Sequence, residues 1–238
     1  MHDTAMRTGQ LFFETYVNGR EGLTIVDLGA GDVNGALRSV APTAKNKFIG
    51  VDMDDCKGVD LVLKDPYDLP FEDSSIDVVV SSSCMEHAEF FWLSYLEMIR
   101  ILKPNGLLYI NSPSNGALHR HPMDCWRFYP DSAVAMSHWA QKNGYKTAVL
   151  ESFTGKQLGD IWNDFVAVFV KDEAFAKDHP NRMIERDKRF TNALVYGDYQ
   201  NFINYSQYPE DQARFKGPKM ELRRKINRNL GKIGVRAS

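Results

Sequence analysis

Two glycines and a carboxylate give this chain its clearest chemical signal. An apolar run over residues 23–28 predicts a buried strand, and it leads into Gly29 and Gly31, where the backbone can turn sharply and let a ligand approach closely. The next apolar run ends in Asp52, 21 residues after Gly31, and a carboxylate there can accept hydrogen bonds from both hydroxyls of a ribose. With a helix expected over residues 34–40, the arrangement predicts a cradle for a nucleotide-containing ligand.

The residues around these glycines leave two cofactor classes open, a dinucleotide and S-adenosylmethionine. A dinucleotide site favours the spacing Gly-x-Gly-x-x-Gly, but the third glycine here, Gly35, comes one residue late. Asp32 stands where a pyrophosphate would meet a negative charge. A neutral or cationic ligand tolerates that charge better, so the loop favours S-adenosylmethionine.

Three more segments follow the glycine loop and Asp52 in a fixed order. They are an acidic residue before a Leu-Pro-Phe turn, a Glu-His pair after a buried apolar run, and a Leu-Lys-Pro-Asn-Gly turn before another apolar run, at residues 65–71, 86–87 and 102–106. In this order the chain resembles class I S-adenosylmethionine-dependent methyltransferases of the small-molecule type over residues 23–171. The resemblance implies S-adenosylmethionine as cofactor and S-adenosylhomocysteine as product. It also implies an α/β fold, a Rossmann-like, doubly wound sheet of seven strands, mostly parallel with the last strand antiparallel.

The same resemblance assigns the cofactor site. The methionine end is expected at the glycine turn, the ribose at the following carboxylate, the adenine beside residues 65–67 and the sulfonium at the end of the fourth strand. The expected cofactor-binding residues are Asp27, Gly29, Gly31, Asp52, Met53, Asp65, Pro66, Tyr67, Ser82 and Ser83. Met53 and Tyr67 also suit plain core packing, and Ser82 also suits the cap of a helix.

A long polar loop, residues 112–130, follows the fifth expected strand, and ligands of open α/β sheets bind beside such loops. It resembles a His-Pro-x-Asp-x-Trp-Arg-Phe pattern of bacterial methyltransferases from sugar and surface-polysaccharide pathways. We therefore expect a small-molecule acceptor, an oxygen of a sugar or of a phosphorylated or nucleotide-linked metabolite, whose proton a general base removes. The candidate catalytic residues are His119, His121, Asp124 and His87, and the candidate substrate-binding residues are Arg120, Trp126 and Arg127.

The residues of this loop allow other interpretations. Asp124 and Arg127 can form an ion pair that only holds the loop, and His87 can pack beneath the adenine segment. The side chains of His119, His121 and Asp124 also suit a divalent metal ion. Base catalysis is favoured over a metal because no further carboxylate cluster is nearby, so no metal is expected.

The elements that must position these residues follow from apolar periodicity and punctuation. We expect a leading helix over residues 8–18, a helix over residues 130–143 that stops at Gly144, a strand over residues 145–151 and a final strand over residues 165–170. The chain then divides into an N-terminal helical segment, a cofactor-binding domain and a C-terminal extension with a basic tail, at residues 1–22, 23–171 and 172–238.

Composition narrows the function further. The chain has 238 residues, a formal net charge of −2, 43 % hydrophobic and 25 % charged residues, which suits a globular enzyme and argues against a general nucleic-acid binder. No apolar run approaches the ~20 residues of a membrane span, and no signal-peptide core is evident. The cysteines lack metal-ligand spacing, so we expect a cytoplasmic protein with reduced thiols. The basic residues 214–236 keep an RNA or protein methyltransferase as an alternative; a dinucleotide oxidoreductase and a non-catalytic binding protein of this fold are the others.

Overall fold

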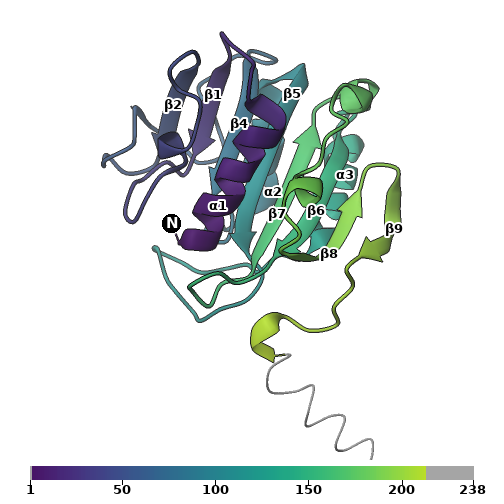
Figure 1. Cartoon of the computed structure of the whole chain (residues 1–238). Coiled ribbons are helices and arrows are strands. Elements are labelled where there is room, and N and C mark those ends of the chain that lie inside the picture. The colour runs from purple at the N-terminus through teal and green to yellow at the C-terminus, as the bar shows by residue number, and fades with distance from the viewer. Residues whose placement is uncertain (1, 213–238) are drawn as a thin grey trace, which may run out of the picture. The chain divides into compact units, whose positions relative to one another are not determined.

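A nine-stranded sheet forms the centre of the structure, a computed structural model that describes residues 2–212. Its spatial order is β3-β2-β1-β4-β5-β7-β6-β8-β9 (Figure 1). The strands are β1 (Thr24–Leu28), β2 (Lys47–Asp52), β3 (Leu61–Val62), β4 (Ile76–Ser82), β5 (Leu102–Pro113), β6 (Ala148–Gly155), β7 (Asp164–Val170), β8 (Phe190–Val195) and β9 (Asp198–Ile203). The neighbouring strands β3, β2, β1, β4 and β5 pair in parallel. Strands β7, β6, β8 and β9 continue the sheet with antiparallel pairing.

Helices cover both faces of this sheet (Figure 1). One face packs against α1 (Asp3–Phe12), the π-helical turn η1 (Phe13–Val17), the 3₁₀ segment η3 (Glu173–Asp178) and α4 (Met183–Arg186). The other face packs against α2 (Phe91–Ile101) and α3 (Pro130–Lys142). Because both faces are covered, every residue of β6 and β7 is buried, and β7 is accordingly apolar throughout after its first residue, Asp164.

The predicted α/β, Rossmann-like fold is confirmed, including the parallel core and the antiparallel strand near residues 165–170. The sheet is larger than the seven strands expected, because β8 and β9 extend it beyond β6. The helix over residues 130–143 is confirmed as α3. The leading helix begins earlier than predicted, at Asp3, and ends in a π-helical turn.

The helix predicted over residues 34–40 is wrong. Only a single 3₁₀ turn, η2 (Leu37–Ser39), forms there. Gly35 has a φ of +111°, outside the right-handed helical region, and its backbone N–H donates to Asp32 Oδ1 at 2.9 Å. The glycine turn therefore presents loop backbone to a ligand, with no long helix behind it.

Residues 2–205 form one compact unit, and the described residues 206–212 belong to a second. The division at residues 22 and 171 stays a prediction, although β8 and β9 belong to the same sheet as β1–β7. The basic tail at residues 214–236 lies outside the described residues. Among the residues described, no helix is long and apolar enough to cross a membrane.

Candidate active site

The loop after β1 is tied to the end of β2. The backbone N–H groups of Gly29 and Ala30 both donate to the carbonyl of Val51, and the N–H of Gly31 donates to Asp52 Oδ2 at 2.9 Å. Gly29 adopts a φ of +85°, and a Cβ added there would lie 2.5 Å from the Cβ of Cys84. Only glycine fits this turn, and the structure brings Gly29, Gly31 and Asp52 together as predicted.

Asp27 is the penultimate residue of β1, two residues before Gly29. Its side chain is buried, and the loss of solvation, reinforced by the nearby charge of Asp52 and opposed by Arg38, raises the pKa of Asp27 to about 7. A cationic group beside this carboxylate would favour its charged form. The ammonium of a methionine moiety is such a group, which agrees with the role expected for Asp27.

Asp32 is held away from the turn by its own contacts. Lys57 Nζ lies 2.5 Å from Asp32 Oδ2, and this ion pair, together with the bond from the Gly35 N–H, lowers the pKa of Asp32. Asp32 therefore stabilises the loop, because Lys57 and the N–H of Gly35 compensate its charge.

The segment expected at the adenine, residues 65–67, lies in the connection between β3 and β4. Asp65 is exposed, and its Oδ1 accepts a hydrogen bond from the N–H of Tyr67 at 2.8 Å. The hydroxyl of Tyr67 accepts one from the N–H of Phe90, which fixes the tyrosine against the start of α2. Pro66 is half-buried beside them, and Met53 is 43 % exposed after β2, so neither Met53 nor Tyr67 is simply core.

The end of β4 carries the two serines expected at the sulfonium. Ser82 is buried and donates to Asn111 Oδ1 on β5 at 3.3 Å. Ser83 follows with a left-handed φ of 53°, its N–H bonded to the carbonyl of Asn111 and its buried hydroxyl unpartnered. This turn directs the chain toward Cys84, which contacts the glycine loop.

The loop after β5 is bonded to the loop after β4. The N–H groups of Cys125 and Trp126 both donate to the carbonyl of Glu86, and Trp126 Nε1 donates to the carbonyl of Ala88 at 2.9 Å. The ring of Trp126 packs among those of Phe91 and Trp92. Trp126 therefore anchors the loop, and the resemblance-based role in substrate binding finds no support in these contacts.

Asp124 and Arg127 form a two-fold ion pair inside this loop. Their Nη1–Oδ1 and Nη2–Oδ2 distances are 2.5 and 2.8 Å, and the Asp124 side chain is 2 % exposed. Arg127 also donates to the carbonyls of Asn115 and Ala117, while Asp124 accepts from the N–H of His119. The guanidinium lowers the pKa of Asp124 far below its usual range, so this carboxylate is a weak base.

The imidazole rings of His87, His119 and His121 lie close together where the loops after β4 and β5 meet. The ring centroids of His87 and His119 are 5.0 Å apart, and those of His87 and His121 are 6.5 Å apart. His87 Nδ1 bonds to the carbonyl of Met123, and burial lowers the pKa of His87, which favours the neutral ring. The structure thus brings together the three histidines that the sequence singled out.

Glu86 lies beside these histidines with its carboxylate 1 % exposed. Neither carboxylate oxygen has a hydrogen-bond partner, and burial raises the pKa of Glu86 to about 7. The backbone N–H of Glu86 itself and the hydroxyl of Ser112 act on this pKa in the opposite direction, yet neither completes a hydrogen bond with the carboxylate. A buried carboxylate without a partner is costly, which marks Glu86 as a group that meets a ligand.

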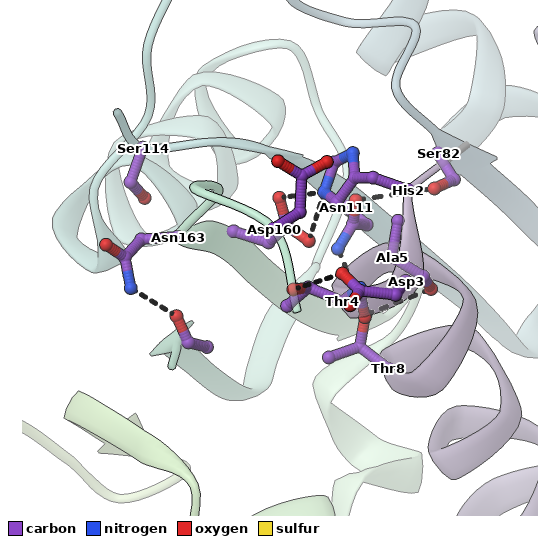
Figure 2. Close-up of polar contacts among 12 residues, drawn as sticks. His2, Asp3, Thr4, Ala5, Thr8, Ser82, Asn111, Ser114, Asp160 and Asn163 are labelled. Carbon is purple, nitrogen blue, oxygen red and sulfur yellow. Dashed lines mark hydrogen bonds and ion pairs between the residues drawn. The ribbon is translucent and has the colours of Figure 1, made fainter. Parts of the chain in front are cut away.

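The start of α1 lies beside Ser82 and Asn111, at the ends of β4 and β5, as Figure 2 shows. His2 Nε2 lies 2.9 Å from both oxygens of Asp164 at the start of β7. Thr8 Oγ1 accepts hydrogen bonds from Tyr109 and from Asn111, the residue that also binds Ser82. Thr8 of α1 thus helps to hold Asn111, which in turn accepts the hydrogen bond from Ser82 at the end of β4.

Trp162 completes the wall of the acceptor side. Its ring lies 4.9 Å from that of His119 and stacks at 5.6 Å on that of His2. It fills the space at Gly116, where an added Cβ would lie 1.9 Å from the indole. The sequence carries no local signal for Trp162 or His2, whereas Glu86 stands in the Glu-His pair but was not predicted to be a site residue.

Comparisons with known proteins agree with this geometry. Residues 26–110 match the model of the family described as "Methyltransferase domain". An uncharacterized methyltransferase of Mycobacterium tuberculosis is 29 % identical over 156 residues, 60 % of each chain, and one of Mycobacterium leprae is 28 % identical over 192 residues, 75 % of this chain and 70 % of its own. The chain thus spans about 60 % of the length of the M. tuberculosis relative.

Solved structures share the fold. The 1,6-didemethyltoxoflavin-N1-methyltransferase of Burkholderia thailandensis, with S-adenosylhomocysteine bound, aligns with a TM-score of 0.57 at 14 % identity over 71 % of this chain and 79 % of its own. The [4+2]-cyclase SpnF aligns with a TM-score of 0.51 at 15 % identity over 70 % and 81 %. The second likeness shows that this fold also carries other chemistry. The match of residues 26–110 to the methyltransferase domain falls on strands β1–β5 and includes this glycine turn, so this part of the chain is similar to S-adenosylmethionine-dependent methyltransferases in both sequence and fold.

Proposed function

We propose that this protein transfers the methyl group of S-adenosylmethionine to an oxygen of a small sugar or phosphorylated metabolite. One observation carries the proposal: the histidine-bearing loop after β5 is hydrogen-bonded to the loop after β4, at the same sheet edge as the glycine turn. That position sets the imidazoles beside the strand end where the sulfonium is expected. The acceptor then approaches from the side of the loop after β5.

Methyl transfer is an in-line displacement, so alignment of acceptor oxygen, methyl carbon and sulfur does most of the work. The C–O bond forms as the C–S bond breaks, and S-adenosylhomocysteine leaves as a neutral thioether. A hydroxyl acceptor must also lose its proton, and we assign that step to His121, which is exposed and can pass the proton to water. Asp124 is unsuited, because Arg127 already holds its charge.

An anionic acceptor agrees with the positive charge left at the rim of the loop. Arg127 is bound to Asp124 and to backbone carbonyls, whereas the side chain of Arg120 is exposed. We therefore place the contact with a phosphate or carboxylate at Arg120 and keep Arg127 as a holder of the loop. The basic tail, outside the described residues, is a second candidate for the same charge.

A direct test measures formation of S-adenosylhomocysteine with panels of hydroxylated sugars, sugar phosphates and nucleotide-linked sugars. We expect turnover with one of these classes, and His121→Asn lowers it about 10²-fold or more without changing S-adenosylhomocysteine affinity. His138→Asn, an exposed histidine on α3, is the matched control. Turnover only with RNA or protein would support the alternative macromolecular acceptor, and cofactor binding without turnover on any panel would favour a non-catalytic binding protein.

A further inference from the structure

Three side chains on the acceptor side form a set of the kind that binds a metal ion. One ligand atom each from Glu86, His87 and His119 lies within 4.8 Å of the other two, and this is the one such group found among residues 2–212. The first two residues follow β4 and the third follows β5, so the set spans the two loops that face the expected acceptor. The sequence pointed to a different trio, of which only His119 belongs here.

The carboxylate of Glu86 supplies an independent reason for a cation. It is 1 % exposed and both of its oxygens are unpartnered, so in the charged form it has no compensating donor. The imidazole of His87 lies beside it, with Nε2 3.8 Å from Oε1 of Glu86. Two ligands that each lie about 2.1 Å from a shared ion are separated by roughly 3 to 4 Å, and the observed distance falls in that range.

Both imidazoles are held through their Nδ1 atoms. His87 Nδ1 faces the carbonyl oxygen of Met123, and His119 Nδ1 lies 3.3 Å from the carbonyl of Ala117 and 3.4 Å from Asp124 Oδ2. At His87 the carbonyl acceptor places the proton on Nδ1 and leaves Nε2 with a free lone pair. At His119, Nδ1 also lies 3.4 Å from Arg127 Nη2, so this nitrogen is held between a guanidinium and two oxygen atoms. Metal-binding histidines are oriented in this way by carbonyl or carboxylate oxygens.

We propose that Glu86, His87 and His119 bind a divalent transition-metal ion that coordinates the acceptor oxygen. Two imidazoles and one carboxylate suit Zn²⁺, Mn²⁺, Fe²⁺ or Co²⁺ better than Mg²⁺ or Ca²⁺, which prefer oxygen ligands. Three protein ligands leave coordination positions for a hydroxyl of the acceptor. The ion stabilises the oxyanion that remains when that hydroxyl gives its proton to His121, and the oxyanion attacks the methyl carbon.

In this arrangement the Asp124–Arg127 ion pair orients His119, one of the proposed metal ligands. Asp124 accepts from the N–H of His119 and also lies beside its ring, so the ion pair fixes the orientation of a metal ligand. The catalytic role of the metal depends on the proposed function, but the binding site itself does not.

The test starts with the full chain, freed of metal with a chelator and dialysed. Calorimetry with Mn²⁺ and the visible absorption of Co²⁺ measure binding, since neither readout needs turnover. We expect one ion per chain, and a loss of affinity of about 10²-fold or more in Glu86→Gln and in His119→Ala. Glu89→Gln and His138→Ala alter exposed residues of the same types and keep wild-type affinity.

Binding of S-adenosylhomocysteine separates this proposal from the proposed function. The Glu86→Gln protein keeps wild-type cofactor affinity, which also shows that it is folded. A wild-type chain that binds the cofactor but no Mn²⁺ or Co²⁺, or a Glu86→Gln chain that binds these ions as the wild type does, would overturn the metal site alone. A folded chain that binds the metal but not S-adenosylhomocysteine would instead overturn the proposed function.

Discussion

The glycine turn after β1 and the cluster around Glu86 lie at the same sheet edge but satisfy their polar groups differently. At the turn, the backbone of Gly31 is already bonded to Asp52, and Asp32 is paired with Lys57. In the cluster, the carboxylate of Glu86 is buried with no partner. The N–H of Gly31 and the carboxylate of Asp32 are therefore paired within the chain, whereas the acceptor side has a buried carboxylate that a ligand must compensate.

This difference suggests separate roles for the glycine turn and for the cluster around Glu86. A preformed loop binds a ligand without reorganisation, which suits a cofactor common to a large family. A cluster with an unpaired carboxylate depends on what enters it, which suits the part of the site that selects the acceptor. A substitution on the acceptor side should therefore leave cofactor affinity unchanged. Gly29 and Gly116, one on each side, allow this independence to be tested.

The largest effect is expected for Gly29→Ala. The added Cβ meets Cys84 at 2.5 Å and the residue keeps an unfavourable φ of +85°, so the loops after β1 and β4 must move apart. Calorimetry should show S-adenosylhomocysteine affinity reduced about 10²-fold or more, close to 3 kcal/mol. Gly197→Ala has a similar φ of +91° with nothing within 4 Å and serves as the control for strain alone. Equal cofactor affinity in the two variants would refute the assignment of this turn.

Gly116→Ala tests the acceptor side in the same way. Its Cβ would lie 1.9 Å from Trp162, which packs on His119, and its φ is +100°. We expect turnover to fall tenfold or more, about 1.4 kcal/mol, with S-adenosylhomocysteine affinity unchanged. Gly144→Ala, with a φ of +91° and open space, is the matched control. Loss of cofactor binding in Gly116→Ala would mean that the two sides are not independent.

Asp124→Asn tests the ion pair that holds the acceptor loop. A buried pair broken on one side costs about 3–5 kcal/mol, and we expect about 2 kcal/mol here because Arg127 keeps its carbonyl acceptors. A thermal melt should show a decrease of roughly 6 °C at pH 7. Because Arg127 lowers the pKa of Asp124 in the folded state, the stabilisation is present above the unfolded pKa of about 3.9 and is lost as pH falls below it. Asp54→Asn, at an exposed position, should change neither value.

A smaller effect is expected from the protonation of Asp27. Burial raises its folded pKa to about 7, so the folded chain holds a proton that the unfolded chain releases near pH 4. The free energy of unfolding therefore declines as pH rises from about 4 to about 7, and we expect Asp27→Asn to remove about 1–2 kcal/mol of that decline. Urea unfolding at pH 5 and pH 8 measures it. An unchanged decline in the variant would assign the proton to another group.

The parts of the molecule that the sequence revealed are those with local signals. Gly29 and Gly31 follow one buried strand and Asp52 ends the next, at a characteristic spacing, and the alternation of apolar runs with helical segments predicts the parallel part of the sheet. The helix expected over residues 34–40 failed because a side chain–backbone bond from Asp32 and the positive φ of Gly35 override the apolar pattern.

The acceptor side could be predicted only in part. His87, His119 and His121 are histidines in polar loops, so the sequence brought them into consideration. The contact of Trp162 with His119 joins residues 43 positions apart, and a sequence pattern carries no sign of such packing. Glu86 stands in a recognisable Glu-His pair, but that its carboxylate is buried without a partner is a property of the folded loops.

The central claim is that cofactor binding and acceptor handling are separate functions of two adjoining sets of loops. A calorimetric titration of S-adenosylhomocysteine into the wild type, Gly29→Ala and Glu86→Gln, under identical conditions, tests it most directly. We predict tight binding to the wild type, the same affinity for Glu86→Gln and an affinity about 10²-fold lower for Gly29→Ala. Binding that is lost in Glu86→Gln, or retained in Gly29→Ala, would contradict the account.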